Sequence, residues 1–230
     1  MSIIDQLRGG LVVSVQPVEG SPLDSTDIIV AMAKAAVAGG AAGLRIEGVR
    51  NVAAVHAEVS IPVIGIVKRE DDASPVRITS TVQDARDLIQ SGADIIAVDM
   101  TSRPRIEPLL PIVQCVHGAN RVLMGDCSTV EDGAEALQLE ASIIGTTLSG
   151  YTDDTQHRVH EPDYELIAQY RKMAGPSGFV MAEGRFNSPE LAARATQAGA
   201  DCVTVGSAIT RLEHVVEWFD TAIKSSLRCS

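Results

Sequence analysis

The stretch Ile61-Pro62-Val63-Ile64-Gly65-Ile66-Val67-Lys68-Arg69 decides how this chain is expected to fold. Its apolar run Val63–Val67 is too short for a helix and rich in β-branched side chains, which is typical of a strand buried on both faces of a parallel sheet. Pro62 suits the first residue of such a strand, where no ladder donor is yet needed. The run ends in Lys68, whose ammonium is costly to bury without compensation. Lys68 therefore either reaches solvent at the strand end or is held there for chemistry.

Length and composition indicate an α/β protein with a substantial core. The 230 residues are 45% hydrophobic but only 3% aromatic, so the core is expected to consist mostly of Ala, Val, Ile and Leu. The net charge of −11 argues against a general nucleic-acid or membrane-surface binder, because phosphate groups would be repelled. A local basic pocket for one small phosphate stays compatible with this charge.

Cysteine spacing and hydropathy indicate the cellular compartment in which the protein is expected. The four cysteines form no CxxC pair and no metal-finger spacing, which favours a reducing environment without disulfides. The N-terminal residues lack the sustained apolar core of a signal peptide, and no apolar stretch approaches the ~20 residues of a membrane span. A soluble, cytoplasmic protein is therefore expected.

A repeated pattern extends the first strand to the whole chain. Four segments combine a glycine or its equivalent, an alanine and a strand-like run, and they begin at Gly40, Gly92, Glu140 and Gly199. In three of them the glycine closes a helix, as a left-handed C-cap does. Four further apolar runs lie between them: Leu11–Gln16, Val63–Lys68, Arg121–Asp126 and Gly178–Glu183. Alternating the two sets predicts eight strands.

Each predicted strand is followed by a helical segment. The helices are expected at Asp27–Ala38, Asn51–Val59, Val82–Gln90, Arg105–Val116, Thr129–Leu139, Asp163–Met173, Pro189–Ala198 and Leu212–Lys224. Eight βα units in this length predict a single closed (β/α)8 barrel, forming one domain over residues 1–230. A doubly wound open sheet is the alternative, but it usually has fewer strands, and its early glycine-rich dinucleotide fingerprint is missing.

Polar side chains follow all eight predicted strands. The C-terminal strand ends of a (β/α)8 barrel converge on one mouth. The residues at these ends are Gln16, Arg45 with Glu47, Lys68 with Arg69, Asp99, Asp126, Thr146 with Thr147, Glu183 with Arg185, and Gly206 with Ser207. Together they predict a charged functional pocket on otherwise apolar strands.

The last two units add a signal for phosphate. Gly184 and Gly206 lie where the backbone could approach a ligand closely, each just before a helix. The loops after the seventh and eighth strands form a phosphate site in many barrels of this kind. A phosphorylated substrate is therefore expected.

Lys68 and Glu183 are the residues best suited to proton transfer. Desolvation of Lys68, with Arg45 or Arg69 nearby, would lower its pKa and make it a base, but the same lysine could form a Schiff base with a carbonyl substrate. Two aspartates without a histidine at ligand spacing are weak support for a metal site. The long loop Ser149–Glu161 is a candidate lid over the mouth.

Several sequence blocks identify a family. The blocks are Ile64–Arg69, Ile143–Thr152, Ala182–Arg185 and Val205–Arg211, and their order and extent cover nearly the whole chain. Through them the chain resembles the bacterial N-acetylmannosamine-6-phosphate 2-epimerases of sialic-acid degradation. The resemblance implies a (β/α)8 barrel that interconverts N-acetylmannosamine 6-phosphate and N-acetylglucosamine 6-phosphate without a redox cofactor or metal.

The resemblance also implies roles for individual residues. Lys68 would be the catalytic base and Glu183 its acidic partner. The substrate-binding residues would be Gln16, Arg45 and Asp126 around the sugar, and Arg211 with Gly184, Arg185, Gly206 and Ser207 near the phosphate. A homodimer acting on a small phosphorylated amino sugar is expected. Two alternatives stay open: a non-catalytic sugar-phosphate-binding barrel, and a Schiff-base aldolase that uses Lys68.

Overall fold

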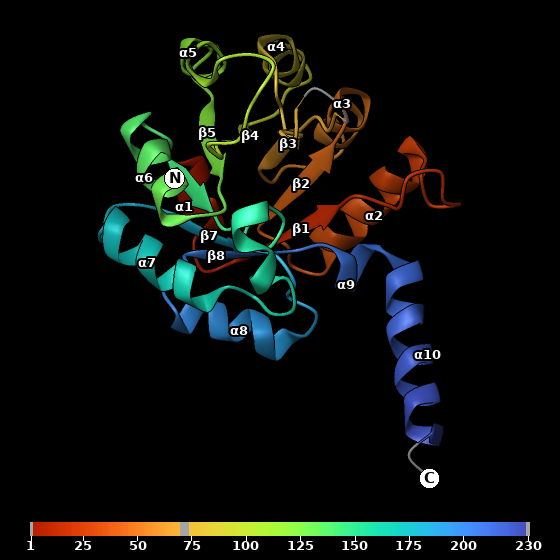
Figure 1. Ribbon diagram of the computed structural model, residues 1–230. Helices are drawn as coiled ribbons and strands as arrows, with labels where there is room; N and C mark the ends of the chain where they lie inside the picture. The colour runs from red at the N-terminus through yellow and green to blue at the C-terminus, as the bar shows by residue number, and fades with distance from the viewer. Residues whose placement is uncertain (1, 70–73, 229–230) are drawn as a thin grey trace.

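Eight parallel strands close into a barrel in the computed structural model, which describes residues 2–69 and 74–228 (Figure 1). Each strand pairs with the next along the chain, and β8 pairs with β1. The strands are β1 (Leu11–Val15), β2 (Gly43–Glu47), β3 (Val63–Ile66), β4 (Ile95–Asp99), β5 (Val122–Asp126), β6 (Ile143–Gly145), β7 (Val180–Glu183) and β8 (Cys202–Val205). The predicted (β/α)8 barrel is confirmed, and the open doubly wound sheet is wrong.

Helices alternate with the strands as the sequence predicts. They are α1 (Ile3–Leu7), α2 (Thr26–Ala38), α3 (Val49–His56), α4 (Val82–Gln90), α5 (Leu109–Gly118), α6 (Val130–Gln138), the 3-10 helix η1 (Asp153–Arg158), α7 (Tyr164–Ala174), α8 (Pro189–Gln197), α9 (Ser207–Thr210) and α10 (Leu212–Arg228). Local chemistry sets their starts: Thr129 caps α6 in a capping box, and Ser188 caps α8 with Pro189 in its first turn.

Side chains along each strand alternate between two apolar cores. The outward set packs against the helices, and there Gly65 leaves room for α4, since a Cβ on it would lie 3.0 Å from Leu88. The inward set fills the barrel with residues such as Ile64, Ile66 and Met181. Continuing the same alternation past Ile66 points Lys68 into the mouth. The period of two therefore places one polar side chain per strand at the C-terminal end of the barrel.

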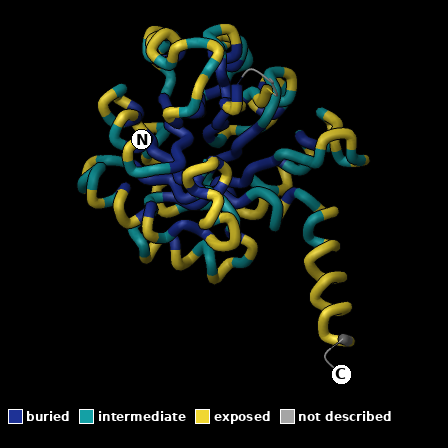
Figure 2. Tube along the Cα trace, viewed as in Figure 1, coloured by how far each residue is buried: buried dark blue, intermediate teal, exposed yellow. Residues whose placement is uncertain are grey.

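Helix α10 departs from the usual arrangement. The helix that follows each strand normally joins the ring around the barrel, but α10 extends away from it (Figure 1) and is exposed along most of its length (Figure 2). Large apolar side chains on it stay accessible, including Phe219 at 69% and Leu227 at 72%. The predicted helix at Leu212–Lys224 is confirmed, but it does not cover the barrel of its own chain. In the described part of the chain, no helix is both long and apolar enough to cross a membrane.

Candidate active site

A buried arginine organises the centre of the mouth. Arg45 on β2 is only 1% exposed and donates from Nη1 and Nη2 to the two carboxylate oxygens of Asp126 on β5, at 3.1 and 2.6 Å. Its Nη1 also lies 3.4 Å from Oε2 of Glu183 on β7. A buried guanidinium is tolerated only when such paired contacts offset its desolvation. The structure thus brings three predicted site residues together across the barrel.

Two hydrogen bonds fix the main chain of Glu183 at the end of β7. Oγ1 of Thr146 accepts from the Glu183 N–H at 3.0 Å and donates to the Glu183 carbonyl at 2.9 Å, which locks β7 to the end of β6. Burial raises the pKa of the Glu183 carboxyl to about 6, and the charge of Asp126 raises it further, while Arg45 and Lys68 oppose the shift. Near neutral pH, Glu183 can therefore exist as either an acid or a carboxylate.

Lys68 projects from the end of β3 on a braced backbone. It pairs with Ile78 in an antiparallel bridge, and its N–H lies 3.4 Å from Oε1 of Glu47. Desolvation lowers the pKa of the Lys68 ammonium, followed by the positive charges of Arg211 and Arg45, while Glu47 and Glu183 oppose the shift. A lysine with a lowered pKa has a larger share of neutral amine that can act as a base.

Arg69 is not one of the cations that lower the pKa of Lys68, as the sequence analysis had considered. Its guanidinium donates three hydrogen bonds to Asp84 of α4, the shortest from Nη2 to Oδ1 at 2.6 Å. Neighbouring residues of an extended strand point to opposite faces, so Arg69 turns outward when Lys68 turns inward. The cations that act on Lys68 are Arg211 and Arg45.

The C-terminal ends of β1 and β8 meet at a second group of predicted residues. Nε of Arg211 donates to the Gln16 carbonyl at 2.9 Å, and Nε2 of Gln16 donates to Oγ of Ser14 at 2.6 Å. Oε1 of Gln16 is buried and has no hydrogen-bond partner within residues 2–69 and 74–228, so it offers an acceptor at the mouth. Gly206 ends β8 beside Ser14, and Ser207 begins α9. These residues line the mouth on the side opposite Asp126.

Arg185 is occupied by the loop between β6 and α7. Its Nη1 and Nε donate to the carbonyls of Ser149 and Glu161, both at 2.7 Å, and its guanidinium lies over the ring of Tyr151. Gly184 before it has a φ of +118°, a conformation that favours glycine. Arg185 thus holds both ends of the predicted lid; its contact with substrate and the motion of residues 149–161 stay predictions.

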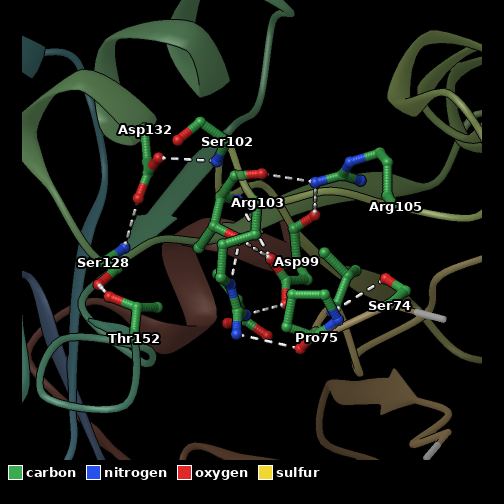
Figure 3. A network of polar contacts seen from close by, with 12 residues as sticks. Ser74, Pro75, Asp99, Ser102, Arg103, Arg105, Ser128, Asp132 and Thr152 are labelled. Carbon is green, nitrogen blue, oxygen red and sulfur yellow. Dashed lines mark hydrogen bonds and ion pairs between the residues drawn. The ribbon is translucent and has the colours of Figure 1, made fainter. Parts of the chain in front are cut away.

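Asp99 is used in a structural network beside the mouth (Figure 3). Its Oδ2 accepts from Nη2 of Arg103 at 2.7 Å and its Oδ1 from the Thr101 hydroxyl at 2.6 Å. Arg103 also donates to the Pro75 carbonyl, so the network joins the loops after β3 and β4. In the described ranges 2–69 and 74–228, no cluster of three or more His, Cys, Asp or Glu could hold a metal ion.

Two residues of the site had no role in the sequence-based prediction beyond their place at a strand end. Glu47 faces Lys68 from β2, and Thr147 places its hydroxyl 2.6 Å from Oδ1 of Asp126 and 3.4 Å from Oε2 of Glu183. Both occupy the inward position of their strands. Successive side chains of a strand point to opposite faces, so Glu47 faces the barrel interior when Ile46 faces the helices, and Thr147 faces inward when Thr146 does not. This rule could have identified both residues from the sequence.

Comparison with known proteins places this site in a family. Residues 29–225 match the family model described as "Putative N-acetylmannosamine-6-phosphate epimerase". Proteins from Haemophilus influenzae and Shigella dysenteriae serotype 1, both described as "Putative N-acetylmannosamine-6-phosphate 2-epimerase", are 51% and 50% identical to this chain; the alignments cover 97% and 99% of this chain and 96% and 100% of theirs.

A solved structure agrees with the sequence relatives. The N-acetylmannosamine-6-phosphate 2-epimerase from Clostridium perfringens superposes with a TM-score of 0.92 at 35% identity, over 96% of both chains. The barrel, its charged mouth and relatives matched along nearly their full length lead to one conclusion. The chain belongs to the N-acetylmannosamine-6-phosphate epimerase family.

Proposed function

We propose that this protein interconverts N-acetylmannosamine 6-phosphate and N-acetylglucosamine 6-phosphate by moving the proton at C2. The observation that carries the proposal is the opposed shift of two groups in one mouth: the pKa of Lys68 is lowered and that of Glu183 is raised to about 6. Titratable groups whose pKa values are pushed toward neutrality mark acid and base assignments.

The chemistry follows from the acidity of C2 beside a carbonyl. In the open-chain sugar, neutral Lys68 takes the C2 proton, and the electron pair of the C–H bond moves into the enolate. Protonated Glu183 stabilises the developing oxyanion by donating a hydrogen bond. A proton that derives from solvent returns to C2 on the opposite face and gives the other epimer, and protonated Lys68 releases its proton to solvent. The free Oε1 of Gln16 supports a role in accepting a sugar hydroxyl, and the Arg45–Asp126 pair holds the floor of the pocket.

Isotope exchange tests the function directly. The purified protein should equilibrate the two sugar phosphates and introduce one solvent deuterium at C2 in both. A non-catalytic barrel would bind the sugar phosphate without exchange. Trapping of substrate on Lys68 by borohydride would instead support a Schiff-base aldolase. The cytoplasmic location expected from the sequence stays a prediction.

Arg211 is proposed to anchor the phosphate, together with the loops at Gly184 and Gly206-Ser207. Arg211→Ala should raise KM much more than it lowers kcat, because a phosphate remote from C2 is held similarly in the ground and transition states. The lost charge-assisted contact should cost about 1.5–3 kcal/mol, or roughly 10- to 150-fold in kcat/KM. Steady-state kinetics in both directions measure this effect. A collapse of kcat at unchanged KM would contradict the anchoring role.

We also infer that the protein acts as a homodimer. The support is the apolar face of α10, on which Leu212, Val216, Phe219 and Ile223 recur at helical spacing and stay more than half exposed. The helix runs away from its own barrel rather than packing beside β8 and β1 (Figure 1). A second copy presents the same apolar face, so a two-fold arrangement would cover both faces at once.

Phe219→Asp should convert this dimer to a monomer. Burial of a phenylalanine contributes about 1.5–3 kcal/mol, so placing a charge there should weaken association by about 100-fold or more. Light scattering coupled to size exclusion should give twice the 24.3 kDa chain mass for the wild type and one chain mass for the variant. Glu217→Gln, two residues before Phe219 and on the polar side of α10, is the matched control. A monomeric wild-type protein would refute the inference.

A further inference from the structure

Lys68 and Asp99 would lie side by side if β3 and β4 stayed paired to their ends. The two strands are parallel, and Ile64 lies opposite Ile95. Counting four residues onward along each strand in the same register sets Lys68 opposite Asp99. Opposite residues of neighbouring strands turn their side chains to the same face, and the strands lie only ~4.8 Å apart. An ammonium and a carboxylate placed in this way would form an ion pair.

A short segment of the loop after β3 separates the two residues. Ile78 of this segment forms an antiparallel bridge with Lys68, and its carbonyl accepts from the Asp99 N–H at 3.0 Å. Thr79 fastens the segment by donating its N–H to the Val67 carbonyl at 2.8 Å. The φ of Thr79 is +48°, a left-handed conformation that is uncommon for a β-branched residue and strains the backbone. The segment is thus held between the ends of β3 and β4 at a local energetic cost.

The side chain of Ile78 lies inside the barrel. It is 6% exposed and belongs to the inward apolar core together with Ile66 and Ala97. Partners in an antiparallel bridge turn their side chains to the same face, so Ile78 stands next to Lys68 on the side of Asp99. A hydrocarbon side chain at this place carries no charge that could stabilise the ammonium, and it keeps the two charged groups apart.

Asp99 is satisfied by other groups. Its side chain is fully buried, and its oxygens accept from the Thr101 hydroxyl at 2.6 Å and from Nη2 of Arg103 at 2.7 Å (Figure 3). Nη1 of Arg103 donates to the Pro75 carbonyl at 3.0 Å, so this cation is fixed by the same loop that carries Ile78. The ion pair of Asp99 is therefore made with Arg103 rather than with the neighbouring strand end.

We propose that Ile78 is a positioning residue that keeps Lys68 out of an ion pair with Asp99. A lysine paired with a carboxylate retains its proton, because an opposite charge within about 4–6 Å favours the charged form. Without that partner, Lys68 can present a neutral amine to the substrate. The value of this amine in catalysis rests on the function proposed above, whereas the separation of Lys68 from Asp99 is a property of the site itself.

The other groups that face Lys68 both favour and disfavour its charge. Burial lowers the pKa of Lys68 most, followed by the positive charges of Arg211 after α9 and Arg45 of β2. Glu47 of β2 and Glu183 of β7 oppose this shift. A third carboxylate, reached across the end of β4, would add to the groups that keep the ammonium protonated.

Shortening the side chain at position 78 tests the proposal. In Ile78→Ala, the pKa of Lys68 should rise by about 1 unit, because the ammonium can then reach Asp99. Protein labelled with ¹³C at the lysine Cε reports this pKa by NMR titration. The chain has only four lysines, and Lys68→Ala assigns the signal. Ile78→Val retains a branched apolar side chain and should keep the wild-type pKa.

A second substitution distinguishes the ion pair from the entry of water. Water admitted beside a smaller side chain would also raise the pKa of Lys68, but only an ion pair depends on the Asp99 carboxylate. Ile78→Ala combined with Asp99→Asn should therefore return to about the wild-type pKa. A rise in Ile78→Ala that Ile78→Val does not show and the double variant reverses supports the proposal. Any other pattern, including a rise that persists in the double variant, overturns it.

Two further outcomes are kept apart from this result. Should circular dichroism show Ile78→Ala unfolded, Ile78→Cys leaves a smaller cavity and carries the same test, again with and without Asp99→Asn. The titration needs no substrate. Failure of the wild-type protein to exchange deuterium at C2 would therefore sink the proposed function while leaving the titration result intact.

Discussion

Lys68→Ala should reduce turnover in both directions by at least about 10²–10⁴-fold and abolish the entry of solvent deuterium at C2. The reason is geometric as well as chemical: Lys68 ends the strand that points into the mouth, and desolvation with two nearby cations lowers its pKa. The other lysines, Lys34, Lys172 and Lys224, lie on the helices α2, α7 and α10. Turnover and isotope exchange, followed by NMR in deuterium oxide, measure the loss.

Two further variants separate loss of the base from loss of the fold. Lys68→Arg keeps the positive charge but cannot lose its proton near neutral pH, so it should be as inactive as Lys68→Ala. Lys34→Ala removes an exposed lysine that pairs with Glu58 and should behave as the wild type. Calorimetry should show that Lys68→Ala still binds the sugar phosphate through the phosphate side of the pocket. Near-normal isotope exchange in Lys68→Ala would mean that the base lies elsewhere.

Glu183→Gln should lower kcat by about 10²–10³-fold with a much smaller change in KM. The amide keeps the shape of the side chain, and the Thr146 contacts are made to the main chain of Glu183, so they survive. What disappears is a group with a pKa near 6 that can give up a proton or donate strongly to a developing oxyanion. The loss should therefore fall on the transition state rather than on binding.

The matched control for this variant is Glu190→Gln in the exposed first turn of α8. Its kcat should stay at the wild-type value, and melting temperatures of both variants check the fold. If Glu183→Gln turned over at a rate close to wild type, the acid would have to be another group, and the assignment of roles within the mouth would need to be rebuilt.

The sequence by itself determined the barrel. Strand and helix signals are local: β-branched runs, glycine C-caps and Ser or Thr N-caps each act within a few residues. Eight successive βα units of this kind are typical of a closed parallel barrel. The same local order placed a polar residue at every strand end, so the chain alone predicted that Lys68, Glu183 and Asp126 lie at the mouth. The family resemblance then supplied the roles that spacing could not.

Only the tertiary structure decided which of these groups meet. Arg45 and Asp126 lie 81 residues apart and pair because β2 and β5 face each other across the barrel interior. Arg69 is next to Lys68 in sequence yet acts on Asp84, since alternate side chains leave a strand on opposite faces. The amphipathic pattern of α10 likewise predicts a helix with one apolar face, but not the surface that covers it. Helix caps and turns are set by residues close in sequence. The pKa values of the site and the surface that covers α10 depend instead on groups that are far apart in sequence and meet only in the tertiary structure.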